Sequence, residues 1–337
     1  MRVRLKDIAS DLNLSKMTIS KVLRGQADIS DATKARVLKR VKELKYIPNI
    51  SASSLRTGQT RTMGLILPIL GEPHLGQVAA GIDHALNEAG YSLVICSSQN
   101  DAEIEQRQIE ALISLQMDAL LIVSTQETTA FFKQEQRIKR SPIIFVDNKP
   151  SGTVKHYVGI HEEEVGRVAC AHLIGCGCKR VAYLRGPRTV VGDLRSSGYR
   201  QGLSDHRLPL LPELLVDNTG SGEPDYKRGY DAMQKLLRRR VPPEGVMAYN
   251  DVMAVGAMDA ARLHGVRIPE EMCFIGCGND EQACQMGMPL SSIDIAGQEV
   301  GHKAGRLAIR MVASGRKAQT HKVLVTPKLV KRLSSQI

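Results

Sequence analysis

The sequence predicts two parts of different fold class: a small all-α domain in residues 1–48, and an α/β body with parallel sheets in two lobes in residues 61–337. Two observations predict this division. Apolar residues recur at helical spacing in the first part, whereas short apolar runs alternate with amphipathic helical segments in the second. The length of 337 residues fits two or three domains, and the 42% hydrophobic and 24% charged composition is that of an ordinary globular protein.

Basic charge is concentrated in the first part. Residues 1–60 hold 13 Lys and Arg against 5 Asp and Glu, whereas residues 61–337 hold 33 against 30, in a chain of net charge +11. A compact basic module on a near-neutral body favours a polyanion as the partner of that module. A basic face that is merely exposed to solvent is the commoner cause of such an excess of charge. The sequence motifs must therefore decide between these two explanations.

Three amphipathic helices are predicted in the first part: residues 5–13, residues 16–23, and a third that begins after the N-cap Ser30 and ends before Pro48. Their predicted inward residues are Leu5, Ile8, Ala9, Leu12, Ile19, Val22, Leu23, Ala35, Val37, Leu38, Val41 and Leu44. Two short helices joined by a tight turn, with a third packed across them, predict a helix-turn-helix domain. The second helix presents outward side chains that suit a DNA major groove, namely Lys16, Met17, Ser20 and Lys21. A three-helix bundle that binds protein is the alternative.

Three sequence blocks occur at an ungapped spacing: LKDIA (5–9), SKMTISKVL (15–23) and YIPN (46–49). Together they resemble the headpiece of the LacI/GalR family of transcriptional repressors. The resemblance implies that base edges are contacted by Lys16, Met17 and Lys21, and phosphates by Ser15, Thr18, Ser20, Ser30 and Asn49. The family usually has Arg at the position of Lys21. Lysine lacks the bidentate guanidinium fork, so base preference at that position is open.

Residues 49–60 (NISASSLRTGQT) form a short Ser-rich segment that pattern alone would allow to be a linker. The resemblance implies a hinge helix instead, which forms on the operator and packs against the hinge helix of the partner subunit. In such proteins an apolar side chain from this helix wedges into a central minor-groove step, and Leu55 is at the matching position. Ala52 and Arg56 are the other predicted hinge contacts.

The body shows repeated β–α alternation. The predicted strands are 64–67, 93–96, 119–123, 143–146, 181–184, 245–248 and 273–276, with helical patterns between them. Such alternation predicts parallel sheets covered on both faces, in two lobes around a cleft. The resemblance implies a periplasmic-binding-protein-like core, with a first lobe of about 61–160 plus 291–320 and a second of about 161–290 plus 321–337.

Polar residues lie at the carboxyl ends of several predicted strands, where open α/β sheets bind their ligands. Asp147 and Asn250 each follow such a strand, and Arg195 lies at the start of a helical segment. Asn and Asp are also common at strand ends and helix caps, so each alone is ambiguous. The resemblance implies that all three hydrogen-bond a small effector. Arg195 is the strongest candidate, since a guanidinium can grip a carboxylate, a phosphate or vicinal hydroxyls.

One segment departs from the family pattern at the end of a strand. Residues 276–279 read GCGN, whereas the family has Gly-aromatic-Asp there. Gly278 thus stands at the position of an effector-binding carboxylate. Asn279, or else Asp280, is expected to compensate.

A second departure lies in the first-lobe loop. Residues 71–75 read GEPHL, whereas relatives often carry Asn-Pro-Phe-Phe, so His74 and Leu75 are the predicted effector contacts of this loop. Aromatic side chains that could stack on a sugar are scarce, and Tyr249 and Tyr183 are the nearest candidates. The expected effector is a sugar or sugar derivative, though not an ordinary neutral sugar.

Motifs for catalysis or for bound cofactors are missing from the sequence. It has no G-x-x-x-x-G-K-[ST], G-x-S-x-G or H-E-x-x-H pattern, so no enzyme, no cofactor and no metal are expected. Soft ligand atoms gather at Cys170, His172, Cys176 and Cys178. Since Cys170 and His172 point to different sides of a helix, incidental thiols are the better account. The seven Cys, and the lack of a signal peptide or a membrane-spanning apolar run, suit the cytoplasm.

These patterns predict a sequence-specific DNA-binding transcriptional regulator, most simply a repressor. It would bind a near-palindromic operator in double-stranded DNA as a homodimer, with a small metabolite in the cleft as its allosteric effector. A ligand-sensing module whose basic domain docks a protein or RNA is the alternative, and the hinge at 49–58 discriminates between them. No Leu heptad follows residues 329–334, so a dimer is expected rather than a tetramer.

Overall fold

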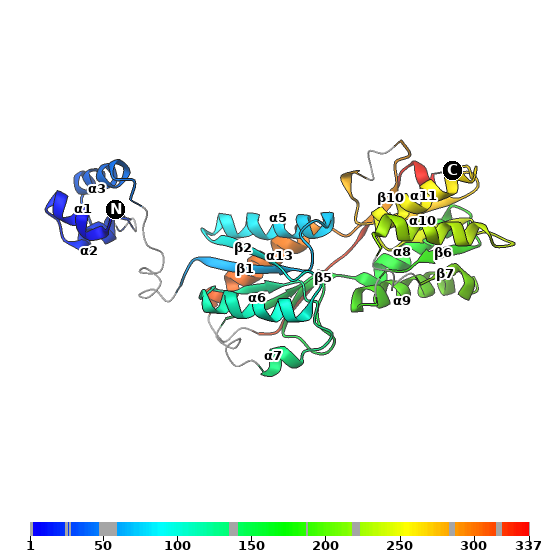
Figure 1. Cartoon of the computed structure of the whole chain (residues 1–337), viewed down its shortest axis with the longest axis horizontal. Helices are drawn as coiled ribbons and strands as arrows, with labels where there is room; N and C mark the ends of the chain where they lie inside the picture. Colours follow the sequence, from blue (N-terminus) through cyan, green and yellow to red (C-terminus); the bar gives the residue numbers. More distant parts are fainter. Residues whose placement is uncertain are drawn as a thin grey trace. The chain divides into compact units, whose positions relative to one another are not determined.

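The computed structural model describes residues 3–23, 26, 28–46, 59–134, 141–186, 188–217, 223–282, 287–314 and 319–336. The chain divides into two compact units, Met1–Thr60 and Arg61–Ile337 (Figure 1). The described part of the first unit is helical. The second unit contains two six-stranded sheets, which define a first and a second lobe. No helix within the described ranges is long and apolar enough to cross a membrane.

Three helices form the first unit: α1 (Leu5–Leu12), α2 (Lys16–Leu23) and α3 (Asp31–Glu43). Asn13 ends α1 in a left-handed conformation (φ 54°), which turns the chain sharply before α2 begins. Each helix contributes a fully buried apolar residue to one small core, and these are Ile8, Ile19 and Val37. The predicted helix-turn-helix arrangement is therefore confirmed.

Two residues that were predicted to face inward lie on the outside of α3. Leu38 is 52% exposed, and Ala35 is exposed as well. Val37, Val41 and Leu44 lie three or four residues apart and form the stripe that packs on α1 and α2. Because each residue turns the helix by about 100°, Leu38 and Ala35 fall outside that stripe.

The first lobe is a parallel sheet with strand order β11-β5-β4-β3-β1-β2. Its strands are β1 (Thr62–Leu67), β2 (Ser92–Ser97), β3 (Leu120–Ile122), β4 (Ile143–Val146), β5 (His156–Ile160) and β11 (His321–Val325). Its helices are α5 (Pro73–Glu88), α6 (Ala102–Ser114), α7 (Ala130–Gln134) and α13 (Gly297–Ser314). Alternate residues of β1 enter opposite cores: Met63 and Leu65 pack with α5 and α13, whereas Ile66 packs with α6.

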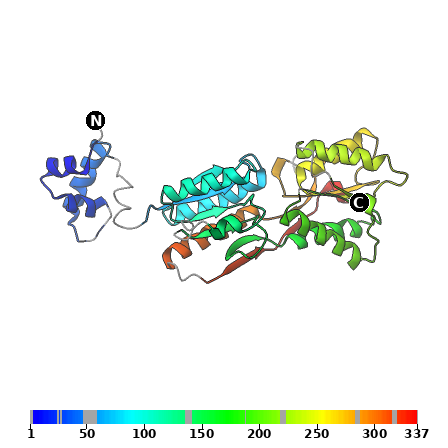
Figure 2. The same cartoon turned by 60° about the horizontal axis from the view of Figure 1, so that its bottom comes forward.

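The second lobe has the strand order β12-β10-β9-β8-β6-β7, in which β12 runs antiparallel to β10. Its strands are β6 (Val181–Leu184), β7 (Leu215–Val216), β8 (Gly245–Ala248), β9 (Cys273–Cys277), β10 (Ser291–Asp294) and β12 (Lys328–Val330). Its helices are α8 (Glu162–Gly175), α9 (Val190–Asp205), α10 (Asp225–Leu237) and α11 (Asp251–Leu263), and short 3₁₀ turns occur at Pro212–Leu214 and Leu333–Ser335. Tyr183 packs with α8 and α9, whereas Leu184 packs with α10 and α11, so helices cover both faces (Figure 2).

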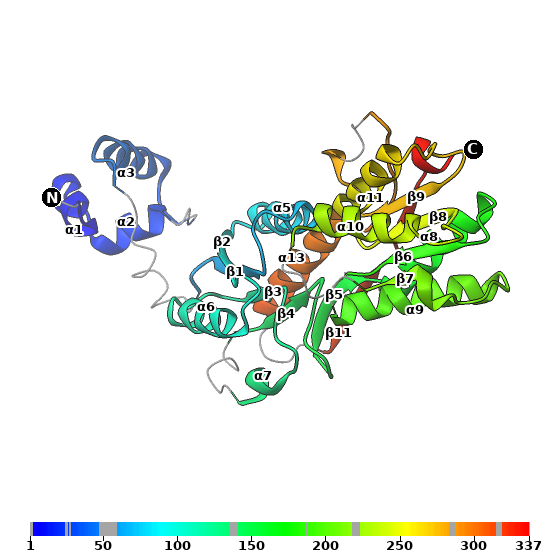
Figure 3. The same cartoon turned by 45° about the vertical axis from the view of Figure 1, so that its right-hand side comes forward.

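Glycines let the covering helices of each lobe pack in close pairs. A Cβ atom on Gly81 of α5 would overlap the carbonyl oxygen of Gln298, and one on Gly301 of α13 would overlap that of Val78. The pairs α8–α9 and α10–α11 are built in the same way. Figure 3 shows α5 and α13 side by side along the first lobe. Such close pairs make each layer of helices a stiff unit.

The predicted lobe boundaries near the C-terminus are wrong. Residues 291–294 form β10 of the second lobe and not part of the first, because they pair with β9. Residues 321–325 form β11 of the first lobe, because they pair with β5. The chain therefore crosses between the lobes after β5, after β10 and after β11. The sequence pattern revealed neither β5 nor β10–β12. Only the hydrogen-bonded pairing of these strands with their neighbours shows to which lobe each belongs.

Candidate functional site

The outer side of α2 carries the three predicted base-reading side chains. Lys16 and Met17 are exposed, and Met17 exposes 66% of its surface. Lys21 is half-buried, and its ammonium group forms an ion pair with Asp28. The predicted contact of Lys21 with DNA would therefore replace this carboxylate by a base or a phosphate.

Two of the predicted phosphate contacts are helix N-caps. The Thr18 N–H donates to Ser15 Oγ at 3.0 Å where α2 begins, and the Thr33 N–H donates to Ser30 Oγ at 3.4 Å where α3 begins. The hydroxyls of Ser15 and Thr18 are also 2.9 Å apart. Ser20 is half-buried on α2. The first N–H groups of a helix point outward, so a residue at the N-terminus of α2 or of α3 can cap the helix and contact a phosphate as well.

The predicted hinge falls almost wholly outside the described residues, which resume at Gln59. The roles of Asn49, Ala52, Leu55 and Arg56 therefore remain predictions.

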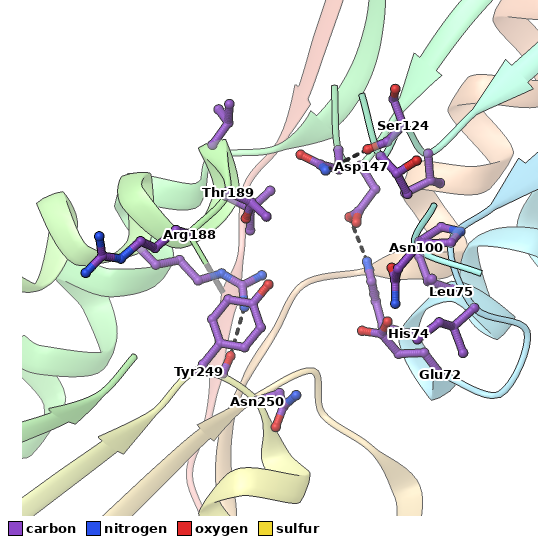
Figure 4. Close-up of a pocket in the computed structure, with 18 of the residues that line it drawn as sticks. Glu72, His74, Leu75, Asn100, Ser124, Asp147, Arg188, Thr189, Tyr249 and Asn250 are labelled. Atoms are coloured by element: carbon purple, nitrogen blue, oxygen red, sulfur yellow. Dashed lines mark hydrogen bonds and ion pairs between the residues drawn. The ribbon is translucent and has the colours of Figure 1, made fainter. Parts of the chain in front are cut away.

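The two lobes enclose a cleft of about 950 Å³. Its walls are loops and helix starts at the carboxyl ends of the strands, as open α/β sheets require. Six of the seven predicted effector residues line it: His74, Leu75, Asp147, Arg195, Tyr249 and Asn250. Figure 4 shows the side chains of both walls converging on this space.

Arg195 organises the second-lobe wall. It lies in α9, is 5% exposed, and donates through Nε to Glu162 Oε2 at 2.6 Å and through Nη1 to the Tyr249 carbonyl oxygen at 2.9 Å. Its guanidinium carbon lies 4.8 Å from the centre of the Tyr249 ring. These contacts fix the plane of the guanidinium. Within the described structure no group bonds the remaining Nη2, which leaves one edge for a ligand.

The first-lobe wall is built around an ion pair between His74 and Asp147. Their Nε2 and Oδ1 atoms are 2.7 Å apart, and their side chains are 11% and 14% exposed. Burial alone would lower the pKa of His74, but the Asp147 carboxylate outweighs it and raises that pKa. Burial alone would likewise raise the pKa of Asp147, but the His74 charge lowers it. Asp147 has a left-handed backbone (φ 59°), a strained conformation that recurs at ligand sites, and Tyr157 donates to its carbonyl oxygen at 2.7 Å.

Asn250 supports the second-lobe wall and also lines it. Its Oδ1 accepts from the Met253 N–H at 2.9 Å, which caps α11, and its Nδ2 donates to Asp225 Oδ2 at 2.6 Å. The same Asp225 pairs with Arg228 at 2.7 Å. Asn250 thus has both the helix-capping role and the position in the cleft that its place after β8 predicted.

Asn279 does not line the cleft, so the prediction that it replaces the missing carboxylate is wrong. Its Oδ1 accepts from Arg332 Nη2 at 2.6 Å, and its N–H donates to Ser292 Oγ at 3.0 Å, both within the second lobe. Cys277 and Gly278 line the cleft in its place. Tyr183 is fully buried against Tyr199 and does not reach the cleft either.

The buried acid behind the end of β9 is Asp251, the first residue of α11. It is 2% exposed and accepts from Ser292 Oγ at 2.6 Å and from the Asp280 N–H at 2.7 Å. Asp280 thus contributes a backbone contact to Asp251. A Cβ atom on Gly276 would overlap Asp251 Oδ1, so the glycine there makes room for the carboxylate. Burial raises the pKa of Asp251 to about 6.

Several lining residues were missed. Ser124–Glu127 follow β3, and Arg188 and Thr189 follow β6, so the rule that ligands bind at carboxyl strand ends would have found them. Glu72 lies in the GEPHL loop, of which only His74 and Leu75 were selected. No local signal marks Glu162 as the partner of Arg195, because the two are 33 residues apart in sequence.

The cysteine-rich segment forms no metal site within the described structure, where no group of three or more His, Cys, Asp or Glu has a suitable arrangement. Cys176 Sγ lies 3.8 Å from His172 Nε2 and donates to the Ser335 carbonyl oxygen at 3.1 Å. Cys178 Sγ donates to the Glu244 carbonyl oxygen at 3.4 Å. These thiols serve as packing and hydrogen-bonding groups.

Comparison with known proteins gives matches for both units. Residues 4–49 match the family described as bacterial regulatory proteins, lacI family, and residues 170–335 match a periplasmic binding protein-like domain. The chain therefore joins a domain of the lacI family of bacterial regulatory proteins to a periplasmic binding protein-like domain. With this combination it is a DNA-binding transcriptional regulator.

Relatives align over nearly their whole length. The ribose operon repressor of Escherichia coli (strain K12) is 29% identical over 332 residues, covering 98% of this chain and 99% of the relative. The regulator DegA of Bacillus subtilis (strain 168) is 28% identical, covering 99% and 98%. The repressor PurR of Haemophilus influenzae (strain PittEE) is 26% identical, covering 98% of each chain.

Solved structures of transcriptional regulators share the fold. The lac repressor dimer bound to operator and the anti-inducer ONPF aligns with a TM-score of 0.88 at 22% identity, covering all of both chains. A complex of the transcriptional regulator CelR with cellobiose aligns with a TM-score of 0.73 at 24% identity, covering 99% of this chain and 100% of the other. The prediction of the family, and of a two-lobed α/β fold that follows a helical unit in the sequence, is confirmed.

Proposed function

We propose that this regulator represses transcription by binding a near-palindromic operator as a homodimer, and that a small metabolite in the inter-lobe cleft controls it. It would act in the cytoplasm, where the DNA of a bacterium lies. One observation carries the proposal: a single chain combines a LacI-family helix-turn-helix unit with a cleft whose two walls each present a fixed charged group.

The DNA-binding half of the proposal is supported by the helical unit. α2 is packed by Ile19 and Val22 on one side and presents exposed Lys16 and Met17 on the other, as a recognition helix must. The relatives include proteins named as repressors, and one structural neighbour is the lac repressor dimer bound to its operator. Two identical units related by a two-fold axis read two half-sites of opposite direction, so the operator is expected to be near-palindromic.

The control half is supported by the cleft. A ligand that accepts from Arg195 in the second lobe and donates to Asp147 in the first would favour one relative arrangement of the lobes. The chain crosses between the lobes at three places, so a change in that arrangement also shifts the first lobe, to which the DNA-binding unit is joined. Coupling is reciprocal, so the operator must change ligand affinity by the same factor.

Selection from a random double-stranded DNA library tests the proposal. The full chain is used at near-physiological salt, which suppresses binding to phosphates alone. The expected result is a two-fold symmetric motif, with base preference at one position of each half-site relaxed by Lys21→Ala. A folded dimer that enriches no sequence, alone or with cell metabolites, would contradict the proposal.

A further inference from the structure

The charges that line the cleft are nearly balanced. Six acidic side chains line it, namely Glu72, Glu127, Asp147, Asp193, Glu223 and Asp225. Five basic ones do, namely His74, Lys149, Arg188, Arg195 and Arg228. A ligand with two negative charges would therefore find no net positive field in this site.

Every arginine of the cleft already has a carboxylate partner. Arg195 pairs with Glu162 at 2.6 Å, Arg228 with Asp225 at 2.7 Å, and Arg188 with Asp217 at 2.9 Å. A guanidinium that is already neutralised in this way attracts a phosphate weakly, because the partner carboxylate repels it. The arginines can still donate hydrogen bonds to hydroxyl or carbonyl oxygens.

Glu72 is in the opposite situation. It is the residue before α5 and lines the cleft, yet within the described structure it forms no ion pair and its side chain does not cap the helix. Its side chain is exposed in the cleft. Partial desolvation there raises its pKa, and the nearby Asp147 and Asp225 carboxylates add to this rise against His74 and Arg195. A ligand cation next to Glu72 would remove this unfavourable interaction.

Glu72 and Asp147 face the cleft from the same wall (Figure 4). Asp147 uses Oδ1 for His74, and within the described residues no group bonds its other oxygen. The carboxylate of Glu72 also stands at the positive end of α5, where an anionic ligand would otherwise be attracted. This wall therefore offers acceptors and negative charge to a ligand, and the opposite wall offers the free edge of Arg195.

We propose that the effector is a polyhydroxylated compound with a protonated amino group, and that this amino group binds Glu72 and Asp147 while its hydroxyl oxygens accept from Arg195. The inference rests on the proposed function, because it names the ligand class of the same cleft. An amino sugar is the simplest compound of this class. It matches both walls: a cation and hydroxyl donors for the first, and oxygen acceptors for the second.

The test is a binding screen of the full chain with matched triads, each a neutral sugar, its amino sugar and its phosphate. D-glucose, D-glucosamine and D-glucose 6-phosphate form one triad, and the galactose and mannose series form others. Calorimetry is expected to show at least one amino sugar that binds ten times or more tighter than the other two members of its triad. Its affinity should fall as pH rises through the pKa of its amino group.

Glu72→Gln supplies the decisive variant, and Glu110→Gln is the matched control, because Glu110 is exposed on α6 and does not line the cleft. Glu72→Gln is expected to lower affinity for the amino sugar about tenfold and to leave the neutral sugar unaffected, while Glu110→Gln keeps the preference. The inference is overturned if no amino sugar binds, if the neutral or phosphorylated member binds as well, or if Glu72→Gln keeps the preference. If a neutral or phosphorylated ligand alters operator affinity, this inference alone is overturned. If no ligand of any class changes the affinity of the chain for its operator, the proposed function is overturned.

Discussion

The two walls of the cleft hold their charged groups in different ways. In the second lobe, the side chains of Arg195 and Glu162 are 6% and 1% exposed, and the Tyr249 ring covers one face of this sealed pair. In the first lobe, the side chains of His74 and Asp147 are 11% and 14% exposed, and burial lowers the pKa of the His74 imidazole less than the Asp147 carboxylate raises it. The two walls therefore have different roles. The second-lobe wall supplies a permanently charged, oriented hydrogen-bond donor, and the first-lobe wall supplies a charge that depends on pH.

Breaking the sealed pair has the largest expected effect. Glu162→Gln leaves Arg195 as an uncompensated buried cation and is expected to lower the free energy of unfolding by about 3–5 kcal/mol. Urea denaturation of the full chain at pH 7 measures it. Glu163→Gln, on the exposed neighbour, is the control and is expected to leave stability unchanged. Equal stabilities of the two variants would contradict the account of this wall.

A second buried acid of the same lobe gives the next largest effect. The folded-state pKa of Asp251 is about 6, above the ordinary value of 3.8, so the folded state binds more protons between these two values. The free energy of unfolding should therefore fall as pH rises from about 4 to about 6, by about 2–3 kcal/mol from this group. Asp251→Asn should flatten that part of the stability profile. A variant with the same slope as the wild type would show that Asp251 is ionised when buried.

The first-lobe pair has a smaller, pH-dependent effect. Because the folded-state pKa of His74 is raised, its stabilisation is full below the unfolded pKa and is lost as pH rises through the folded pKa. Because the pKa of Asp147 is lowered, its share is lost only as pH falls through that lower value. His74→Gln should thus destabilise the protein by about 1–2 kcal/mol at pH 6 and by much less at pH 9.

The exposed His84, which lies 3.5 Å from Glu88 on α5, provides the control for this prediction. His84→Gln should change stability at neither pH. A His74→Gln effect of equal size at pH 6 and pH 9 would mean that His74 acts by packing and not by charge.

The smallest effect is expected at the rim of the cleft. The side chain of Arg188 is 74% exposed and pairs with Asp217 at the surface. Exposed ion pairs are screened and add little, so Arg188→Gln should leave the denaturation midpoint where it is. A clear loss of stability would mean that the rim, and not the sealed Arg195–Glu162 pair, holds this wall together.

Sequence predicted the fold wherever periodicity was strong. The strands that became β1, β4, β6 and β9 were visible as apolar runs because parallel strands are buried on both faces. β10 and β11 were assigned to the wrong lobes because their partners, β9 and β5, are distant in sequence and only pairing fixes them. Periodicity also misled at Leu38, which is apolar yet lies off the packed stripe of α3.

The site was predictable where a strand end carried a polar residue. Asp147 and Asn250 were found by that rule, and Arg195 was strengthened by family resemblance. Glu162 was not found, because its role depends on burial beside a residue on another helix. Asn279 was misassigned for a similar reason: its side chain is held by Arg332, which lies 53 residues away in sequence.

The most direct test of the central claim is the affinity of the full chain for its selected operator, with and without the compound that most raises its thermal stability. Wild type and Asp147→Asn are compared, since this substitution removes the negative charge of Asp147 and replaces one acceptor oxygen by a donor, while the sealed Arg195–Glu162 pair stays intact. The account predicts that the compound changes operator affinity tenfold or more in the wild type. It also predicts that Asp147→Asn keeps the affinity measured without the compound and loses the response. A variant that responds like the wild type, or a wild type with no response, would contradict control through this cleft.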